Sequence, residues 1–236
     1  MKNRISVIAF DADDTLWVNE PFFRESEEKF SRLLAAYESE SQVMTILFET
    51  EIRNLALYGY GIKGFMLSMI ETILTVTEHK ATPELFERAL AIGKEMFDKP
   101  VELLPGVEEV LKKLYGKYRL VVATKGDLLD QERKLKKSGL HHYFHHIEIM
   151  SDKQESDYEK LVKHLDCPVN EFLMIGNSLK SDVLPVLAIG GNAIHIPFHT
   201  TWLHEHVEDE IVHNNFYQMT ALADILPNLI GNEKET

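Results

Sequence analysis

The chain has little cysteine, few basic residues and no long apolar run. Cys167 is the only cysteine among 236 residues, so no disulfide can form within the chain. No apolar run approaches the roughly 18 residues that cross a membrane, and no basic segment followed by an apolar one indicates export. With 25 Lys and Arg against 38 Asp and Glu, the formal net charge is −13. This excess disfavours binding to nucleic acid or anionic lipid, so we expect a cytoplasmic protein with neither partner.

The composition is that of an ordinary globular protein, with 44% hydrophobic and 27% charged residues. The segment from Pro21 to about Pro100 has a helical pattern and no strong strand. Its apolar residues recur at intervals of three and four, as Phe30, Leu33 and Leu34 show. Thr82 and Pro83 fit the N-cap and the first turn of the last helix. The expected helices are 22–38, 42–57, 63–77 and 83–97.

After Pro100, short apolar strands alternate with helical segments. Together with a first strand at 5–10, they predict right-handed crossovers and a mostly parallel sheet with helices on both faces. The remaining expected strands are 118–123, 146–150, 172–175 and 193–196. The expected helices between them are 107–114, 128–137, 157–165 and 181–189.

These two patterns predict an α/β core with an inserted all-helical domain. The core comprises residues 1–17 and 99–236, and the insertion comprises residues 18–98. Because the insertion follows the first strand directly, we expect it to overhang whatever that strand end binds.

Three carboxylates, Asp11, Asp13 and Asp14, follow the first strand within four residues. Carboxylates this close raise one another's pKa unless a cation organises them. Side chains two residues apart in extended chain point the same way, so Asp11 and Asp13 can converge on one ligand. One would act as a nucleophile and the other as a general acid and base. An acidic loop that caps a helix is the alternative for this segment alone.

Three later segments place compatible groups at strand ends. Thr124 and Lys125 close the strand at 118–123, where a hydroxyl, backbone amides and a cation can hold phosphate oxygens. Lys153 follows the strand at 146–150 and brings a second cation to the same edge. Asn177 and Asp182 follow the strand at 172–175 and offer the hard oxygen ligands that suit Mg²⁺.

These four segments, in this order, resemble the four motifs of the haloacid dehalogenase superfamily of hydrolases. The run Asp11-Ala12-Asp13-Asp14-Thr15 resembles the first motif, Thr124 the second and Lys153 the third. Gly176-Asn177-Ser178 with Ser181-Asp182 resembles the fourth. The resemblance implies a Rossmann-like parallel sheet, and the helical insertion resembles the family's helical-bundle cap, of the subfamily I or C1 type.

The resemblance also implies a role for each residue. Asp11 would attack phosphorus and form an aspartyl-phosphate, while Asp13 would protonate the leaving oxygen and then activate water. Thr124 and Lys153 would bind the phosphoryl oxygens, and Lys125 and Lys160 are the alternative cations to Lys153. The Mg²⁺ ligands would be Asp11, the Asp13 backbone carbonyl and Asp182, with Asn177 where many relatives have an acid. We therefore expect Mg²⁺ binding that is retained but weaker.

Asp13 separates the possible reactions within the family. Relatives that cleave carbon–halogen bonds lack an acid at this position, because a halide leaves without a proton. An alkoxide leaving group requires one. The expected activity is therefore Mg²⁺-dependent hydrolysis of a small soluble phosphate monoester, such as a nucleotide, flavin nucleotide or sugar phosphate. A sugar phosphomutase is the near alternative, and a weakly active binding or regulatory protein is the third.

Substrate selectivity is expected to depend on the cap. Arg53, Tyr58, Tyr60 and Lys63 surround two glycines between predicted helices, where aromatic and cationic side chains suit a phosphorylated metabolite. Packing within the helical insertion is the alternative role for these tyrosines. The sequence carries no signal of oligomeric state.

Overall fold

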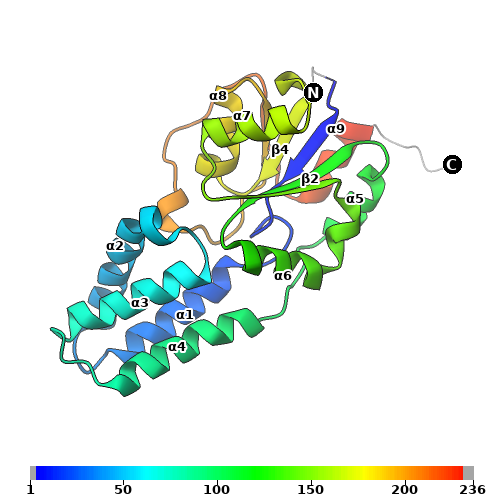
Figure 1. Ribbon diagram of the computed structural model, residues 1–236. Helices are drawn as coiled ribbons and strands as arrows, with labels where there is room; N and C mark the ends of the chain where they lie inside the picture. The colour runs from blue at the N-terminus through cyan, green and yellow to red at the C-terminus, as the bar shows by residue number, and fades with distance from the viewer. Residues whose placement is uncertain (1–3, 231–236) are drawn as a thin grey trace. The chain divides into compact units, whose positions relative to one another are not determined.

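The computed structural model describes residues 4–230 as two compact units (Figure 1). One unit contains residues 4–18, 101–125 and 132–230. The other contains residues 19–100 together with residues 126–131. Each unit has its own hydrophobic core.

Within residues 4–230, the first unit contains a six-stranded sheet of order β3-β2-β1-β4-β5-β6 in which all neighbours are parallel. Strand β1 is central because it pairs with β2 on one side and β4 on the other. The carboxyl ends of three adjacent strands therefore meet beside Asp11, which follows β1. The strands are β1 (Val7–Phe10), β2 (Arg119–Lys125), β3 (His146–Met150), β4 (Phe172–Gly176), β5 (Asn192–His195) and β6 (Phe216–Gln218).

Alternate residues of the central strand pack on opposite faces of the sheet, as the strand period requires. Ile8 and Phe10 join one core with residues of α5 (Val107–Leu114) and α6 (Leu128–Ser138). Val7 and Ala9 join the other core with residues of α7 (Glu155–His164) and α8 (Leu184–Ala188). The short helix α9 (Leu226–Ile230) packs on the α5 side. The expected parallel sheet with helices on both faces is confirmed.

The second unit is a helical bundle, visible as the four blue-to-green helices in Figure 1. Large apolar side chains from all four helices, including Phe30, Leu47, Met69 and Met96, form its core. Thr82 occupies the predicted N-cap, but its side chain makes no capping hydrogen bond. The helices are α1 (Glu20–Leu33), α2 (Glu40–Tyr58), α3 (Ile62–Val76) and α4 (Pro83–Asp98).

The short elements after β5, which are β6, α9 and two 3-10 helices at Leu203–Glu205 and Leu222–Ile225, were not predicted. Strand β6 has three residues and none of them is fully buried, so its apolar signal is weak. Helix α9 has only five residues. The helix expected at 181–189 begins instead as a π-helical turn, Leu179–Val183, which leads into α8. Pro185 near the start of α8 lacks an N–H group, so the chain can change its hydrogen-bond pattern there.

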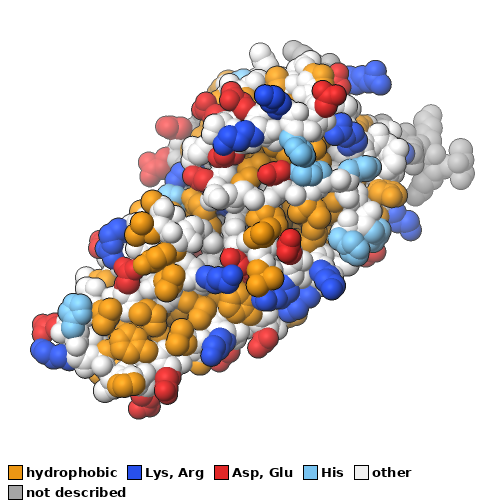
Figure 2. All heavy atoms as spheres, in the orientation of Figure 1, with side chains coloured by type: hydrophobic (Ala, Val, Ile, Leu, Met, Phe, Trp, Pro, Cys, Tyr) orange, Lys and Arg blue, Asp and Glu red, His pale blue; other side chains and the backbone are white. Residues whose placement is uncertain are grey.

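No helix within residues 4–230 is both long enough and apolar enough to cross a membrane. Figure 2 shows acidic and basic side chains interspersed over the visible face of the molecule.

Helices α1 and α2 bring three glutamates close to one arginine in the helical unit. Arg24 pairs with Glu20 at 3.2 Å and with Glu27 at 3.1 Å. Burial, together with the negative charges of Glu27 and Glu20, raises the pKa of Glu51 to about 8. Glu51 is therefore protonated in the folded protein at neutral pH, whereas in the unfolded chain it is ionised above its ordinary value of 4.5.

Glu51→Gln is expected to increase the free energy of unfolding at alkaline pH. Between the unfolded and folded pKa values the folded state holds one more proton, so wild-type stability falls as pH rises through this window. At roughly 1.4 kcal/mol per pKa unit, the gain in the variant reaches a few kcal/mol near pH 8 and disappears near pH 4. Urea denaturation at both pH values measures it. Glu49→Gln, an exposed change on the same helix, is the control; equal gains in both variants would contradict the prediction.

Candidate active site

Asp11 lies at the carboxyl end of the central strand and is buried, with 7% of its surface exposed. Its backbone N–H donates to Ile175 at 2.9 Å, which extends the β1–β4 pairing by one residue. The Lys153 ammonium bridges two carboxylates: it donates a short hydrogen bond to Asp11 Oδ1 and another to Asp182 Oδ1 at 2.6 Å. The structure therefore brings together three segments that the sequence analysis singled out: Asp11 is from the first, Lys153 from the third and Asp182 from the fourth.

The bridging lysine follows β3, and only 1% of its side chain is exposed. Burial alone would lower the pKa of Lys153, but the charges of Asp11 and Asp182 raise it well above its usual range. The ammonium group therefore stays charged between the two carboxylates. A fixed cation at this position can neutralise the oxygens of a group transferred to or from Asp11.

The electrostatic surroundings of Asp11 are dominated by burial, which raises the pKa of its carboxyl to about 7. Lys153 opposes this effect, whereas the second buried carboxylate, Asp182, adds to it. Two carboxylates thus share one ammonium. An additional cation at this site would favour the ionised form of Asp11, which is the form that can act as a nucleophile.

Asp182 reaches the site from the turn after β4 because Gly176 has no side chain. A Cβ atom at position 176 would lie 2.1 Å from Asp182 Oδ2, far inside van der Waals contact. The same oxygen accepts the backbone N–H of Ser178 at 3.0 Å. Glycine thus leaves the space in which the carboxylate sits.

Gly176→Ala is expected to displace Asp182 and to lower activity by about 100-fold or more, because a small misplacement of site groups has effects of that size. Steady-state kinetics of the folded variant measures the loss. Gly116→Ala is the control for activity. Gly116 has a φ of 77°, so alanine strains the backbone and lowers stability, but a Cβ atom there would have no neighbouring atom within 4 Å, and the folded variant should keep its activity. Near wild-type activity in Gly176→Ala would show that Asp182 tolerates displacement.

Asn177 connects the fourth segment to the first. With its amide nitrogen facing β1, it donates to the Asp13 backbone carbonyl at 3.1 Å and to Asp11 Oδ2 at 3.2 Å. Thr15 lies at 3.1 Å from the same nitrogen, and its hydroxyl donates to Asp11 Oδ2 at 3.3 Å. One carboxylate oxygen, one backbone carbonyl and one side-chain amide therefore converge at this strand end.

The Asp13 side chain is held by two residues that the sequence analysis did not single out. Trp17 Nε1 donates to Asp13 Oδ1 at 2.7 Å. The Lys134 ammonium lies 2.6 Å from Oδ1 and 2.8 Å from Oδ2. Of the Asp13 side chain, 23% remains exposed, so its carboxylate is oriented yet accessible to a reacting group.

The second segment lies on the neighbouring strand. Phe10 pairs with Val122 in the β1–β2 register, so Thr124 lies two residues further toward the edge that carries Asp11. Thr124 is buried, with 2% of its surface exposed. The next residue, Lys125, extends to Ser181 Oγ at 2.8 Å and to Glu205 at 2.5 Å. Lys125 therefore already has a carboxylate partner.

The oxygens at this site fit Mg²⁺ by chemical type. Within residues 4–230, no three His, Cys, Asp or Glu side chains form a metal-binding group. The oxygen donors here are the carboxylates of Asp11 and Asp182 and the Asp13 backbone carbonyl, and the Asn177 amide nitrogen donates to Asp11 and to that carbonyl. Oxygen donors of these kinds are the ones that Mg²⁺ takes, commonly with water in the remaining positions. The space that Gly176 leaves for Asp182 also favours this arrangement.

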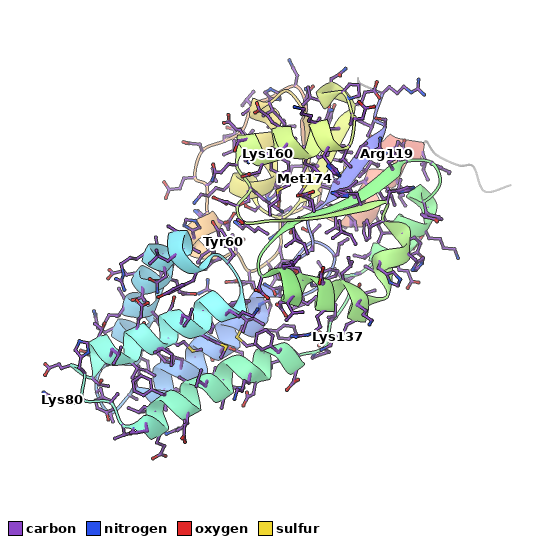
Figure 3. All side chains as sticks on the ribbon, in the orientation of Figure 1. Tyr60, Lys80, Arg119, Lys137, Lys160 and Met174 are labelled. Atoms are coloured by element: carbon purple, nitrogen blue, oxygen red, sulfur yellow. The ribbon has the colours of Figure 1, made fainter. Side chains whose placement is uncertain are left out.

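The cap residues proposed for selectivity lie in the helical unit. Tyr58 donates to Glu71 at 3.0 Å, and Arg53 pairs with the same carboxylate at 3.5 Å. Lys63 pairs with Asp127 at 3.0 Å, within the same compact unit. Tyr60 lies in the loop between α2 and α3 (Figure 3). Glu71 thus connects Arg53 with Tyr58, a partner that the sequence pattern did not indicate.

The position of some residues at the site could be predicted from the sequence, and that of others could not. Thr15 lies within the first segment, four residues after Asp11, so its position was available from the motif. Lys134 is one of several basic residues on α6, and its pairing with Asp13 depends on tertiary packing. Lys160, seven residues after Lys153, is exposed and pairs with Asp157 on α7 (Figure 3).

Comparisons with known proteins agree with this fold. The model of the haloacid dehalogenase-like hydrolase family matches residues 5–190, and the chain belongs to that family. A haloacid dehalogenase-like hydrolase from Xanthomonas campestris is 37% identical and has a TM-score of 0.84. That similarity covers 96% of this chain and 91% of the other.

Two further relatives have phosphatase names. A glyceraldehyde 3-phosphate phosphatase from Methanothermobacter thermautotrophicus is 27% identical over 114 residues, which are 46% of this chain. The chain spans about half of that relative, since the match covers 48% of its length. A phosphatase of the same superfamily from Thermococcus onnurineus, 20% identical, shares the fold with a TM-score of 0.63, covering 96% of this chain and 99% of that one.

Proposed function

We propose that this protein is a Mg²⁺-dependent phosphatase that hydrolyses a small soluble phosphate monoester through an aspartyl-phosphate on Asp11. The observation that carries the proposal is the buried Asp11 carboxylate, held by Lys153 beside Asp182 at the end of the central strand. A cation beside a buried nucleophile is what the transfer of a phosphoryl group requires.

In the first half of the reaction, an Asp11 carboxylate oxygen attacks phosphorus, and the bond from phosphorus to the leaving oxygen breaks. Asp13 in its acid form donates a proton to that oxygen, so the product leaves as an alcohol. Lys153 and the hydroxyl of Thr124 bind the transferring oxygens. Trp17 and Lys134 fix the position of the Asp13 side chain.

In the second half, the Asp13 carboxylate accepts a proton from water as the water oxygen attacks phosphorus. The bond between phosphorus and Asp11 breaks, which releases inorganic phosphate and restores both aspartates. Asp11, Asp182 and the Asp13 carbonyl would hold Mg²⁺. Asn177 would become a further oxygen ligand, or a partner of a metal-bound water, once its amide turns from the orientation in which its nitrogen contacts Asp11 and Asp13. When bound, Mg²⁺ supplies positive charge that offsets repulsion between the carboxylates and the phosphoryl oxygens.

Phosphate ester hydrolysis is preferred over dehalogenation because Asp13 is present and oriented. A halide leaving group needs no proton, whereas an alkoxide does. The name of the Methanothermobacter relative, a glyceraldehyde 3-phosphate phosphatase, supports a small phosphorylated metabolite as the substrate class.

The domain division is part of the same proposal. Residues 1–17 and 99–236 would form the hydrolase core, and residues 18–98 would form a helical-bundle cap of the C1 type. Within this cap, Arg53, Tyr58, Tyr60 and Lys63 would select the substrate, with Glu71 orienting the first two.

A panel of phosphate monoesters assayed with Mg²⁺ tests the proposal. We expect release of inorganic phosphate from some esters, loss of release after chelation of divalent metal, and recovery when Mg²⁺ is added. Product analysis with a sugar bisphosphate activator distinguishes a phosphomutase, which would yield an isomeric sugar phosphate instead of inorganic phosphate. Failure to hydrolyse any ester of the panel by the folded, Mg²⁺-supplied protein would overturn the proposal.

A further inference from the structure

Glu205 lies outside all four segments singled out in the sequence. It ends a short 3-10 helix, Leu203–Glu205, in the connection between β5 and β6. Its side chain is only 10% exposed. A carboxylate that is withdrawn from water in a connecting segment requires specific partners, because an unpaired buried charge is strongly unfavourable.

The partners of Glu205 come from two different strand ends of the core unit. Lys125 Nζ, at the end of β2, lies 2.5 Å from Glu205 Oε1. The hydroxyls of Ser178 and Ser181, in the turn after β4, both donate to Glu205 Oε2 at 2.5 Å. Both carboxylate oxygens therefore accept hydrogen bonds, and the negative charge faces one ammonium group.

This set of bonds keeps Glu205 ionised. Although burial alone would raise its pKa, Lys125 and the two serine hydroxyls lower the pKa of Glu205 to about 2. Charge-assisted hydrogen bonds to an ionised acceptor are shorter and stronger than those between neutral groups. The connection between β5 and β6 is thus attached firmly to two strand ends.

The two serines belong to the turn that carries Asp182. Ser178 Oγ accepts the Ser181 N–H at 3.0 Å, and the Ser178 carbonyl accepts the Asp182 N–H at 2.9 Å. The Ser178 N–H in turn donates to Asp182 Oδ2 at 3.0 Å. The Tyr158 hydroxyl, from α7, donates to the Ser181 carbonyl at 2.9 Å. A shift of either serine therefore moves the Asp182 carboxylate.

We propose that Glu205 is a positioning residue of the hydrolase site, which holds Ser178, Ser181 and Lys125 together and thereby fixes Asp182 for Mg²⁺ binding. This inference rests on the proposed function, because it assigns Glu205 a role in the affinity of that same site for Mg²⁺. Glu205 acts through the turn and does not itself contact the groups that react. Lys125 is thereby placed as a structural cation between β2 and the turn.

The test is isothermal titration of metal-free protein with MgCl2, which measures binding without any turnover. Glu205→Gln keeps the size of the side chain but removes its charge, and we expect the dissociation constant for Mg²⁺ to rise by about 10-fold to 100-fold. Ser181→Ala removes one of the three bonds to Glu205 and the bond from Lys125 to Ser181, but it leaves Glu205 paired with Lys125, so we expect a smaller rise in the same direction. If Glu205→Gln does not fold, the Mg²⁺ affinity of Ser181→Ala tests the proposal.

Glu109→Gln is the matched control, because Glu109 forms an exposed ion pair with Lys113 at 2.7 Å on α5. It makes the same chemical change far from the turn in sequence and is expected to leave Mg²⁺ affinity unchanged. A role of Glu205 in stability alone would lower the unfolding temperature of the metal-free protein without changing the dissociation constant of the folded protein.

The results distinguish a failure of the role proposed for Glu205 from a failure of the proposed phosphatase function. If the wild-type protein binds Mg²⁺ and hydrolyses phosphate esters, while Glu205→Gln and Ser181→Ala bind Mg²⁺ within a factor of about two of wild type, only the role of Glu205 is overturned. If the wild-type protein neither binds Mg²⁺ nor hydrolyses any ester, the proposed function is overturned and the role of Glu205 falls with it.

Discussion

Asp11→Asn is expected to lower phosphatase activity by at least about 1000-fold, since removal of a catalytic nucleophile has effects of this order. An amide nitrogen cannot attack phosphorus, and the amide oxygen is a poor nucleophile beside the carboxylate it replaces. The variant keeps the size of the side chain at the end of β1. Steady-state release of inorganic phosphate with a good ester substrate measures the loss.

A second measurement identifies the covalent step. Acid quenching of the wild-type enzyme during turnover, followed by mass spectrometry of its peptides, should find one phosphoryl group on the peptide that contains Asp11. The Asp11→Asn protein should carry none. Turnover by the variant at the wild-type rate would show that another group attacks phosphorus.

Asp14→Asn is the matched control because it makes the same change three residues away. Asp14 has a positive φ of 61°, and asparagine is one of the few residues that adopt this conformation readily. We place Asp14 outside the chemistry, so this variant should retain activity close to that of wild type.

Lys153→Met is expected to lower activity by about 100-fold or more, because the fixed positive charge that faces the phosphoryl oxygens is lost. Methionine is similar in length to the buried part of lysine, so the change removes mainly the charge. The kinetic loss should appear in kcat as well as in kcat/KM, since the cation acts on charge that develops during transfer.

The same substitution leaves two buried carboxylates, Asp11 and Asp182, without their shared cation. Breaking a buried ion pair by removing one partner lowers the free energy of unfolding by about 3 to 5 kcal/mol. The pKa of Asp11 is already raised to about 7 by burial. The folded variant therefore binds protons more readily than the unfolded chain, and its stability should fall as pH rises.

Urea denaturation of metal-free Lys153→Met measures both effects when the pH is varied from the ordinary Asp11 pKa of 3.8 to its raised value of about 7. Lys160→Met is the control, because Lys160 is on the exposed side of α7, with 76% of its side chain exposed and an i,i+3 pair with Asp157. It should change neither activity nor stability appreciably. Equal behaviour of the two variants would show that Lys153 does not organise the site.

Much of the fold could be predicted because its elements have strong local patterns. Strand β1 and strand β4 are buried on both faces, so they read as continuous apolar runs ended by polar residues. The short elements β6 and α9 lack such runs, and their positions follow from packing against neighbours distant in the sequence. The π-helical start of the segment at 179–183 likewise depends on the contacts of Ser178 and Asp182.

The sequence by itself determined which groups follow the strands, and therefore that Asp11, Thr124, Lys153 and Asp182 are candidates for one site. It could do so because the carboxyl ends of parallel strands meet at one edge of a sheet. The pairing of charges across that edge was decided only by the tertiary structure. Lys153 bridges two carboxylates, and Lys134 holds Asp13.

Glu205 is the clearest example of a residue whose role could not be predicted from the sequence. No local pattern marks it, since it lies in a connecting segment after the last predicted strand. Its role depends on bonds to Lys125, Ser178 and Ser181, which are between 24 and 80 residues away in the chain. Such contacts exist only once the sheet has brought β2 and β4 to either side of β1, so periodicity and motif spacing carry no trace of them.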